Sequence, residues 1–198
     1  MRILLCIACF MVEALAIGQG FNERFDLFGN GFAQTAYGIE RTPEGYCVIS
    51  GSSDYDSIGV DSYYFHVSVV HTFLSTTGER TAEVRNWRPW HSMFPGWANC
   101  CDTIPGGGYV VGGSSEDSTG MSAVILMRFK TEGDTLWTRV FDDPDLNHYW
   151  IGRQVKRASN GDLLVVGDSD ASGGDADGFV LRTDRKGEGL WRGPRCGM

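Results

Sequence analysis

The sequence predicts an all-β fold made of a repeated unit of antiparallel strands. One pattern occurs three times: a glycine-containing turn precedes an apolar strand that ends in small or polar residues. The copies are Tyr46–Ser53, Tyr109–Ser115 and Leu163–Ser169. Glycine accounts for 27 of the 198 residues, and no amphipathic periodicity longer than about ten residues follows the N-terminus. Short strands joined by glycine-rich turns are typical of all-β proteins.

A second set of glycines gives the length of the unit. Gly78, Gly133 and Gly187 follow one another at intervals of 55 and 54 residues, and the first copy carries an insertion before its second turn. Four-stranded sheets repeated at this spacing form the blades of β-propellers. We therefore predict a β-propeller-like array of four-stranded antiparallel blades, with three repeats and an incomplete ring.

Each unit is expected to contain four strands in a fixed order. A short first strand, such as Ile151–Arg157, leads into the repeated second strand. The third strand is an apolar run, and the fourth begins at the second glycine turn, as in Thr135–Phe141. The second and third strands are apolar on both faces, which predicts that they lie between neighbouring sheets. The fourth alternates more clearly and is expected at an edge.

The N-terminus has the pattern of a secretory signal peptide. Arg2 precedes an apolar run that ends near Val12, and small residues at Ala14–Ala16 offer a cleavage site. We predict a signal peptide at residues 1–18 and a secreted, extracellular or cell-surface protein. The apolar run is too short to span a bilayer, so no membrane span is expected. The partial propeller would then occupy residues 19–198, with repeats at about 34–94, 95–148 and 149–191.

Both ends of the chain bear on the number of units. Residues 21–29 resemble the fourth-strand stretch Trp137–Asp142, and Gly193 and Pro194 interrupt the last fourth strand. We interpret the sequence as a truncated propeller; the alternative is an open three-unit array that closes by oligomerising. Either way, we expect exposed apolar surface near Val48–Ile49 and Val180–Leu181.

Charge and cysteine content narrow the expected partners. The formal net charge is −8 and no basic stripe occurs, so nucleic acid is not expected as a partner. Beyond the signal peptide there are four cysteines: Cys47, Cys100, Cys101 and Cys196. Disulfides, including a vicinal Cys100–Cys101 bridge, and free buried thiols both remain open.

Two groups of residues are candidates for a site. Carboxylates at Asp168, Asp170, Asp175 and Asp177 could hold Ca²⁺, although Phe179 stands where a calcium loop needs a bidentate glutamate. The alternative is a solvated turn stabilised by Asp and Ser side chains. The second group is aromatic: Trp87, Trp90 and Trp97 cluster near the insertion. They are expected either to bind a sugar or protein partner or to pack beneath the inserted loop.

The third unit, residues 160–191, resembles the β-propeller repeats of secreted bacterial proteins of the Bacteroidetes type. Its Leu163–Ser169 strand, the Gly-Gly-Asp at 173–175 and Trp191 carry the resemblance, which extends over residues 34–191. Proteins of this kind often end in a sorting domain for type IX secretion. Tyr109–Gly113 looks like a kelch repeat, and Thr131–Trp137 looks like the tryptophan-docking motif of quinoprotein dehydrogenases; both are more remote.

These observations predict a secreted, non-catalytic β-propeller module that binds protein or glycan or serves as a cell-surface scaffold. An enzyme is not expected, because no nucleophile elbow, no phosphate loop and no histidine spacing typical of a metal site occurs in the sequence. No cofactor is expected apart from the candidate Ca²⁺. The alternative is an exported propeller hydrolase or lyase with its site on the top of the array.

Overall fold

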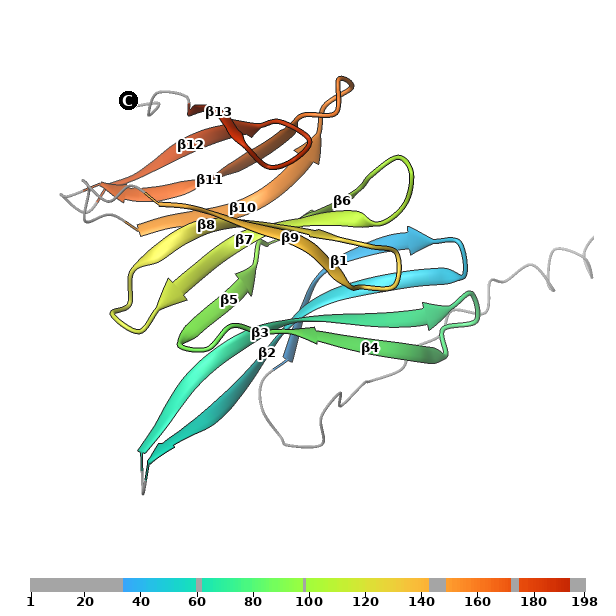
Figure 1. Cartoon of the computed structure of the whole chain (residues 1–198), viewed down its shortest axis with the longest axis horizontal. Coiled ribbons are helices and arrows are strands. Elements are labelled where there is room, and N and C mark those ends of the chain that lie inside the picture. The colour runs from blue at the N-terminus through green and yellow to red at the C-terminus, as the bar shows by residue number, and fades with distance from the viewer. Residues whose placement is uncertain (1–33, 60–61, 98, 143–148, 172–174, 193–198) are drawn as a thin grey trace, which may run out of the picture.

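The computed structural model describes residues 34–59, 62–97, 99–142, 149–171 and 175–192. Within these ranges the chain forms thirteen strands and no helix, and every ladder is antiparallel (Figure 1). The strands make three sheets, which we call the first, second and third sheet in chain order. This confirms the predicted all-β fold with antiparallel sheets. No helix of the described residues is long and apolar enough to cross a membrane.

The strands follow one another in the order that the repeat predicts. The first sheet contains β1 (Gln34–Thr42), β2 (Gly45–Gly59), β3 (Ser62–Ser75) and β4 (Arg80–Asn86). The second contains β5 (His91–Pro95), β6 (Cys101–Thr103), β7 (Tyr109–Asp117), β8 (Ser122–Phe129) and β9 (Thr135–Phe141). The third contains β10 (Tyr149–Arg157), β11 (Leu163–Ala171), β12 (Asp175–Thr183) and β13 (Gly189–Arg192).

The second sheet has a divided first strand. Both β5 and β6 pair with β7, so together they take the place that β1 and β10 have in the other sheets. The pairing of β5 places residues 91–94 in the second sheet, whereas the sequence boundary put them at the end of the first repeat.

The glycine turns show which residues occupy equivalent positions in the three sheets. Gly78, Gly133 and Gly187 have φ angles of 90°, 91° and 80°, and each donates its N–H to the carbonyl three residues earlier. Glycine adopts this left-handed conformation without the steric penalty that a Cβ brings. Measured from these turns along the paired strands, Tyr46 in the first sheet and Tyr109 in the second occupy equivalent positions.

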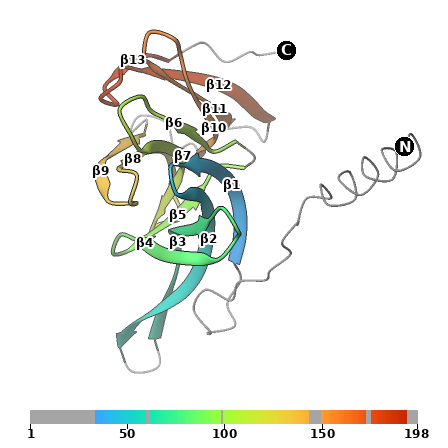
Figure 2. The same ribbon diagram turned by 90° about the vertical axis from the view of Figure 1, so that its right-hand side faces the viewer.

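The second sheet lies between the other two and packs on both of them (Figures 1 and 2). Tyr109, Val111, Ile125, Met127 and Phe129 join Cys47, Ile49 and Val69 of the first sheet in one buried cluster. Val110, Val124 and Leu126, on the opposite face, join Val155, Leu163, Val165, Phe179 and Leu181 of the third sheet in another. The alternation follows from the two-residue period of a strand.

Both interfaces use corresponding faces of the sheets. Cys47 and Val69 hold the positions in the first sheet that Val110 and Val124 hold in the second, and each pair contacts the sheet that follows. The glycine turn of the following sheet completes the contact. A Cβ added at Gly187 would lie 2.9 Å from the Trp137 ring, and one added at Gly133 would lie 3.1 Å from the Phe73 ring.

The exposed apolar surface differs in part from the expectation. Val166 and Val180 on the outer face of the third sheet are 39% and 37% exposed, as anticipated for that end. Ile49 and Leu181 are buried instead, because their side chains face the second sheet. The oligomer expected from such surface stays a prediction.

The insertion of the first repeat lengthens one hairpin. β2 and β3 span 15 and 14 residues, against nine and eight in β7 and β8. The hairpin therefore extends beyond the rest of the molecule (Figures 1 and 2).

The stacking of sheets makes a prediction for stability. Leu126 is fully buried between the second and third sheets, whereas Leu136 on β9 is half exposed. Replacing Leu126 with alanine should lower the free energy of unfolding by about 2–5 kcal/mol, since it leaves a cavity in the interface. The matched Leu136→Ala variant should change it by less than about 1 kcal/mol. Urea denaturation measures both; equal losses would contradict the interface described here.

Candidate functional site

The first strands of the three sheets share an irregularity at the same position. The β1–β2 register skips Tyr37, and the β10–β11 register skips Arg153. In the second sheet the gap widens: Pro95 pairs with Gly113 and Cys101 with Val111, so residues 96–100 lie between two paired positions. Such bulges release one strand from its ladder and change the direction of a side chain, and they are common beside binding sites.

The three bulges meet at one cleft. Tyr37, Trp97 and Arg153, each from a different sheet, line a cavity of about 210 Å³. Its remaining walls come from β5, β7, the start of β8 and β10: Phe94, Pro95, Ser114, Glu116, Ser122, Ile151 and Gly152. Aromatic rings and a few polar groups in a concave surface are the usual composition of a small-molecule site. We therefore take this cleft as the candidate functional site.

The segment that carries Trp97 is held between the second and third sheets. Gly96 donates its N–H to the Gly112 carbonyl at 2.9 Å, and the Asn99 carbonyl accepts from Val155 N–H at 3.4 Å. A Cβ at Gly96 would lie 2.2 Å from the Arg153 carbonyl oxygen, so only glycine permits this approach. The position of Trp97 is thus set by backbone contacts to both sheets.

An ion pair supports the indole of Trp97. The Arg153 guanidinium lies 4.1 Å from the centre of the Trp97 ring. The same guanidinium donates to both carboxylate oxygens of Asp168, from Nε at 2.5 Å and from Nη2 at 3.0 Å. Two-point contacts of this kind fix the plane of a guanidinium. Trp97 nevertheless stays 62% exposed, so most of its ring remains accessible to a ligand.

Of the three tryptophans singled out from the sequence, Trp97 alone lines the cleft. Trp87, Trp90 and Trp97 are all more than half exposed, which differs from packing beneath an inserted loop. Trp87 lies beside His66 of β3, with ring centres 6.1 Å apart, and only Trp97 lines the cleft. Tyr37 and Arg153 are cleft residues that the sequence did not reveal, because a bulge has no compositional signal.

The structure describes two of the four candidate calcium ligands. Asp168 gives both oxygens to Arg153. Asp177 pairs with Ser169 whereas Asp168 pairs with Gly178, so the two carboxylates start from opposite faces of the ladder. The side chains of Asp170 and Asp175 lie outside the described residues. Among the described side chains, none of the His, Cys, Asp and Glu groups form a cluster able to hold a metal. Calcium binding stays a prediction.

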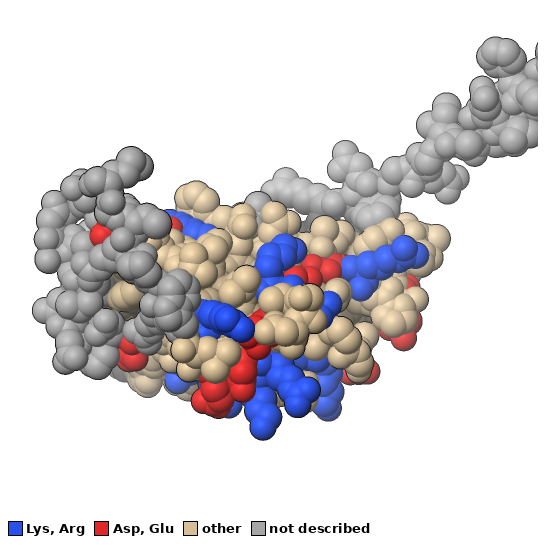
Figure 3. Space-filling model, turned by 90° about the horizontal axis from the view of Figure 1, so that it is seen from above, with Lys and Arg blue, Asp and Glu red and all other residues tan. Residues whose placement is uncertain are grey.

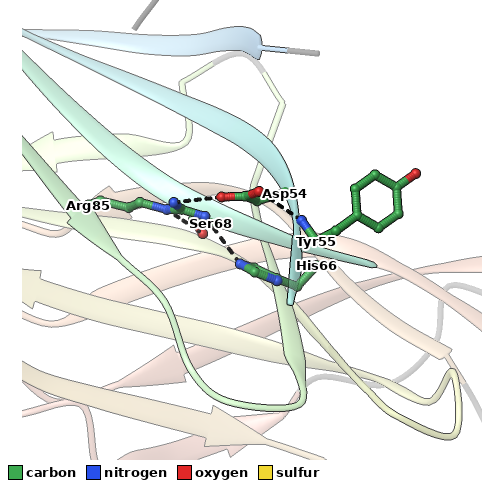
Figure 4. A network of polar contacts seen from close by, with 5 residues as sticks. All are labelled: Asp54, Tyr55, His66, Ser68 and Arg85. Carbon is green, nitrogen blue, oxygen red and sulfur yellow. Dashed lines mark hydrogen bonds and ion pairs between the residues drawn. The ribbon is translucent and has the colours of Figure 1, made fainter. Parts of the chain in front are cut away.

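A second polar group lies at the root of the long hairpin (Figure 4). Arg85 donates to Asp54 at 2.9 Å and to Ser68 at 3.0 Å, and its Nη2 lies 3.1 Å from His66 Nε2. Partial burial opposes ionisation of Asp54, yet the hydrogen bonds from Tyr55 N–H and Arg85 hold its pKa below the usual range. The group joins β2, β3 and β4, which indicates a structural role.

A third group is buried between the first and second sheets. The Tyr109 hydroxyl lies 2.7 Å from His71 Nδ1, and the Cys47 thiol donates to the same hydroxyl at 3.6 Å. Burial raises the pKa of Cys47 to about 12 and lowers that of His71 to about 3. Cys47, Cys100 and Cys101 are free buried thiols. A neutral histidine and a protonated Cys47 thiol away from solvent do not supply a nucleophile.

The surface carries both signs of charge. On the face seen from above, Lys and Arg side chains adjoin Asp and Glu side chains (Figure 3).

No protein-family model matches the chain, and it has no match among curated proteins.

The buried histidine makes stability depend on pH. Unfolded histidine has a pKa of about 6.5, so between about pH 6.5 and pH 3 the unfolded chain binds a proton that folded His71 does not. The free energy of unfolding should fall as pH falls, by about 2 kcal/mol between about pH 7 and pH 5 from this group.

Denaturation at the two pH values tests this expectation. A His71→Asn variant should lose about that much of the pH dependence. Should this variant fail to fold, NMR titration of the His71 ring in the intact protein gives the answer directly. A ring that titrates near its ordinary pKa would contradict the burial described here.

Proposed function

We propose that the chain is a secreted, non-catalytic module of propeller-like blades that binds carbohydrate in the bulge-lined cleft. One observation carries the proposal. Tyr37, Trp97 and Arg153 come from three different sheets and are released from their ladders at the same position, and all three line one cavity. A shared position of this kind suits a binding surface assembled by the repeat.

The propeller-like arrangement draws support from the two interfaces. In each, one face of a sheet packs on the opposite face of the next, and the glycine turn of the later sheet contacts the earlier one. Successive blades of a propeller contact one another face to face around a central axis. The cleft would then lie where the innermost strands of three blades approach that axis.

Carbohydrate fits the size and chemistry of the cleft. Its volume of about 210 Å³ is below the roughly 300–1,000 Å³ typical of pockets for drug-sized ligands, which suits one sugar ring at a time. The exposed Trp97 ring can stack on the C–H face of a sugar, while Ser114, Ser122 and Glu116 can hydrogen-bond hydroxyl groups. A protein partner would need a broader apolar surface than this cleft presents.

Hydrolysis of a glycan is less well supported. Glycosidases use two carboxyl groups on either side of the bond that breaks. Among the described residues that line the cleft, Glu116 is the one carboxylate, and the nearby Asp168 is engaged by Arg153. We therefore favour binding over the hydrolase or lyase alternative.

Export is part of the proposal and rests on the signal-peptide pattern of residues 1–18. The exported chain is expected to begin near Ile17 or Gln19, after small residues. Intact-mass measurement checks this expectation, and an extracellular protein that retains Met1 would contradict it.

The binding proposal predicts a difference between two tryptophans of similar exposure. Isothermal titration with β-1,4-linked hexasaccharides of glucose, glucosamine and N-acetylglucosamine should reveal binding of at least one of them. Trp97→Ala should weaken that binding about tenfold or more, since it removes the stacking surface. Trp87→Ala, which changes an exposed indole outside the cleft, should bind as the unaltered protein does. If none of these sugars binds, a β-1,4-linked glycan is not the ligand. If both variants lose affinity equally, the ligand does not bind in the cleft.

A further inference from the structure

The charges at the cleft do not balance. Arg153 is the one described basic residue that lines it, and Asp168 neutralises this guanidinium through a two-point ion pair. Glu116 also lines the cleft, and no described Lys, Arg or His side chain forms an ion pair with it. The cleft as a whole therefore carries one carboxylate that has no counter-charge among the described residues.

The place of Glu116 suits contact with a ligand. It pairs with Ser122 across the β7–β8 ladder and with Ser92 across the β5–β7 ladder. The Ser92 hydroxyl already accepts a hydrogen bond from Val67 N–H, whereas Ser122 lines the cleft beside Glu116. A half-buried carboxylate next to a hydroxyl group, with an exposed indole in the same cavity, forms a set of groups that fits a sugar carrying a cationic substituent.

We infer that the cleft selects amino sugars and that Glu116 recognises their protonated amine. This inference rests on the proposed carbohydrate binding and adds the class of sugar. Trp97 would stack on the ring, and the Glu116 carboxylate would accept a charge-assisted hydrogen bond from the ammonium group. Uronic acids would be disfavoured, because their carboxylate would face Glu116 while Asp168 already occupies Arg153.

Two hexasaccharides isolate the effect of the amine. β-1,4-Linked glucosamine and glucose hexamers have the same linkage and ring, and they differ in an amine or a hydroxyl at C2. At pH 6 and low salt the protein should bind the glucosamine hexamer about tenfold more tightly, which is the effect of one charge-assisted hydrogen bond. At pH 9, where the amine is deprotonated, this preference should disappear while affinity for the glucose hexamer stays the same.

Two glutamate variants show whether the preference belongs to the cleft. Glu116→Gln should bring affinity for the glucosamine hexamer to within about twofold of that for the glucose hexamer. Glu132→Gln makes the same change of charge at an exposed turn between β8 and β9 and should keep the preference. This comparison separates the contact from general attraction of a cation to a protein of net charge −8.

The possible results separate amino-sugar selection from the proposed carbohydrate binding. Binding of both hexamers without preference at pH 6, or a preference that survives in Glu116→Gln, would overturn amino-sugar selection and leave carbohydrate binding intact. Equal loss of preference in both glutamate variants would also overturn it. If neither hexamer binds at either pH, amino-sugar selection fails, whereas the proposed binding of β-1,4-linked glycans fails only if the N-acetylglucosamine hexamer does not bind either.

Discussion

The need to cover two apolar faces of one sheet determines the architecture. Val110 and Val111 are adjacent on β7, and both are fully buried, one against the third sheet and the other against the first. A strand that is apolar on both faces cannot meet solvent on either side without losing the free energy of burial. The second sheet is therefore stable only between two others, and the face-to-face stacking of all three follows from this requirement.

The stacking in turn separates the residues that stabilise the sheets from the residues that line the cleft. Side chains held in the ladders of the inner strands fill the interfaces, whereas the bulged positions of the first strands are released from the ladders. Tyr37, Trp97 and Arg153 occupy these positions, and they differ in chemistry although their places correspond. A bulge at a fixed position thus allows the residue to vary without disturbing the interface. The cleft forms where the three bulges meet, and its chemistry depends on which residues occupy them.

The repeat made much of the fold predictable from sequence, and particular residues show where prediction ended. The spacing of Gly78, Gly133 and Gly187 located the turns, because only glycine suits their left-handed backbone. The bulges had no such signal, since Tyr37 and Arg153 are ordinary residues within regular patterns. From the sequence, Asp168 is a candidate Ca²⁺ ligand or part of a solvated turn, because only its neighbours in sequence are visible there. Its partner, Arg153, is brought close by the pairing of Ile151 with Asp168.

If the three sheets together form the proposed binding cleft, a bound ligand should affect residues of all three, and NMR mapping of backbone amides measures this. The glucosamine hexamer would be titrated into the isotopically labelled protein. We expect shift changes in all three bulged regions, at Tyr37–Gly38, at Gly96–Trp97 and at Gly152–Gln154, with little change at the turn between β8 and β9. Changes confined to a single sheet, or located on the outer face of the third sheet around Val166 and Val180, would contradict it.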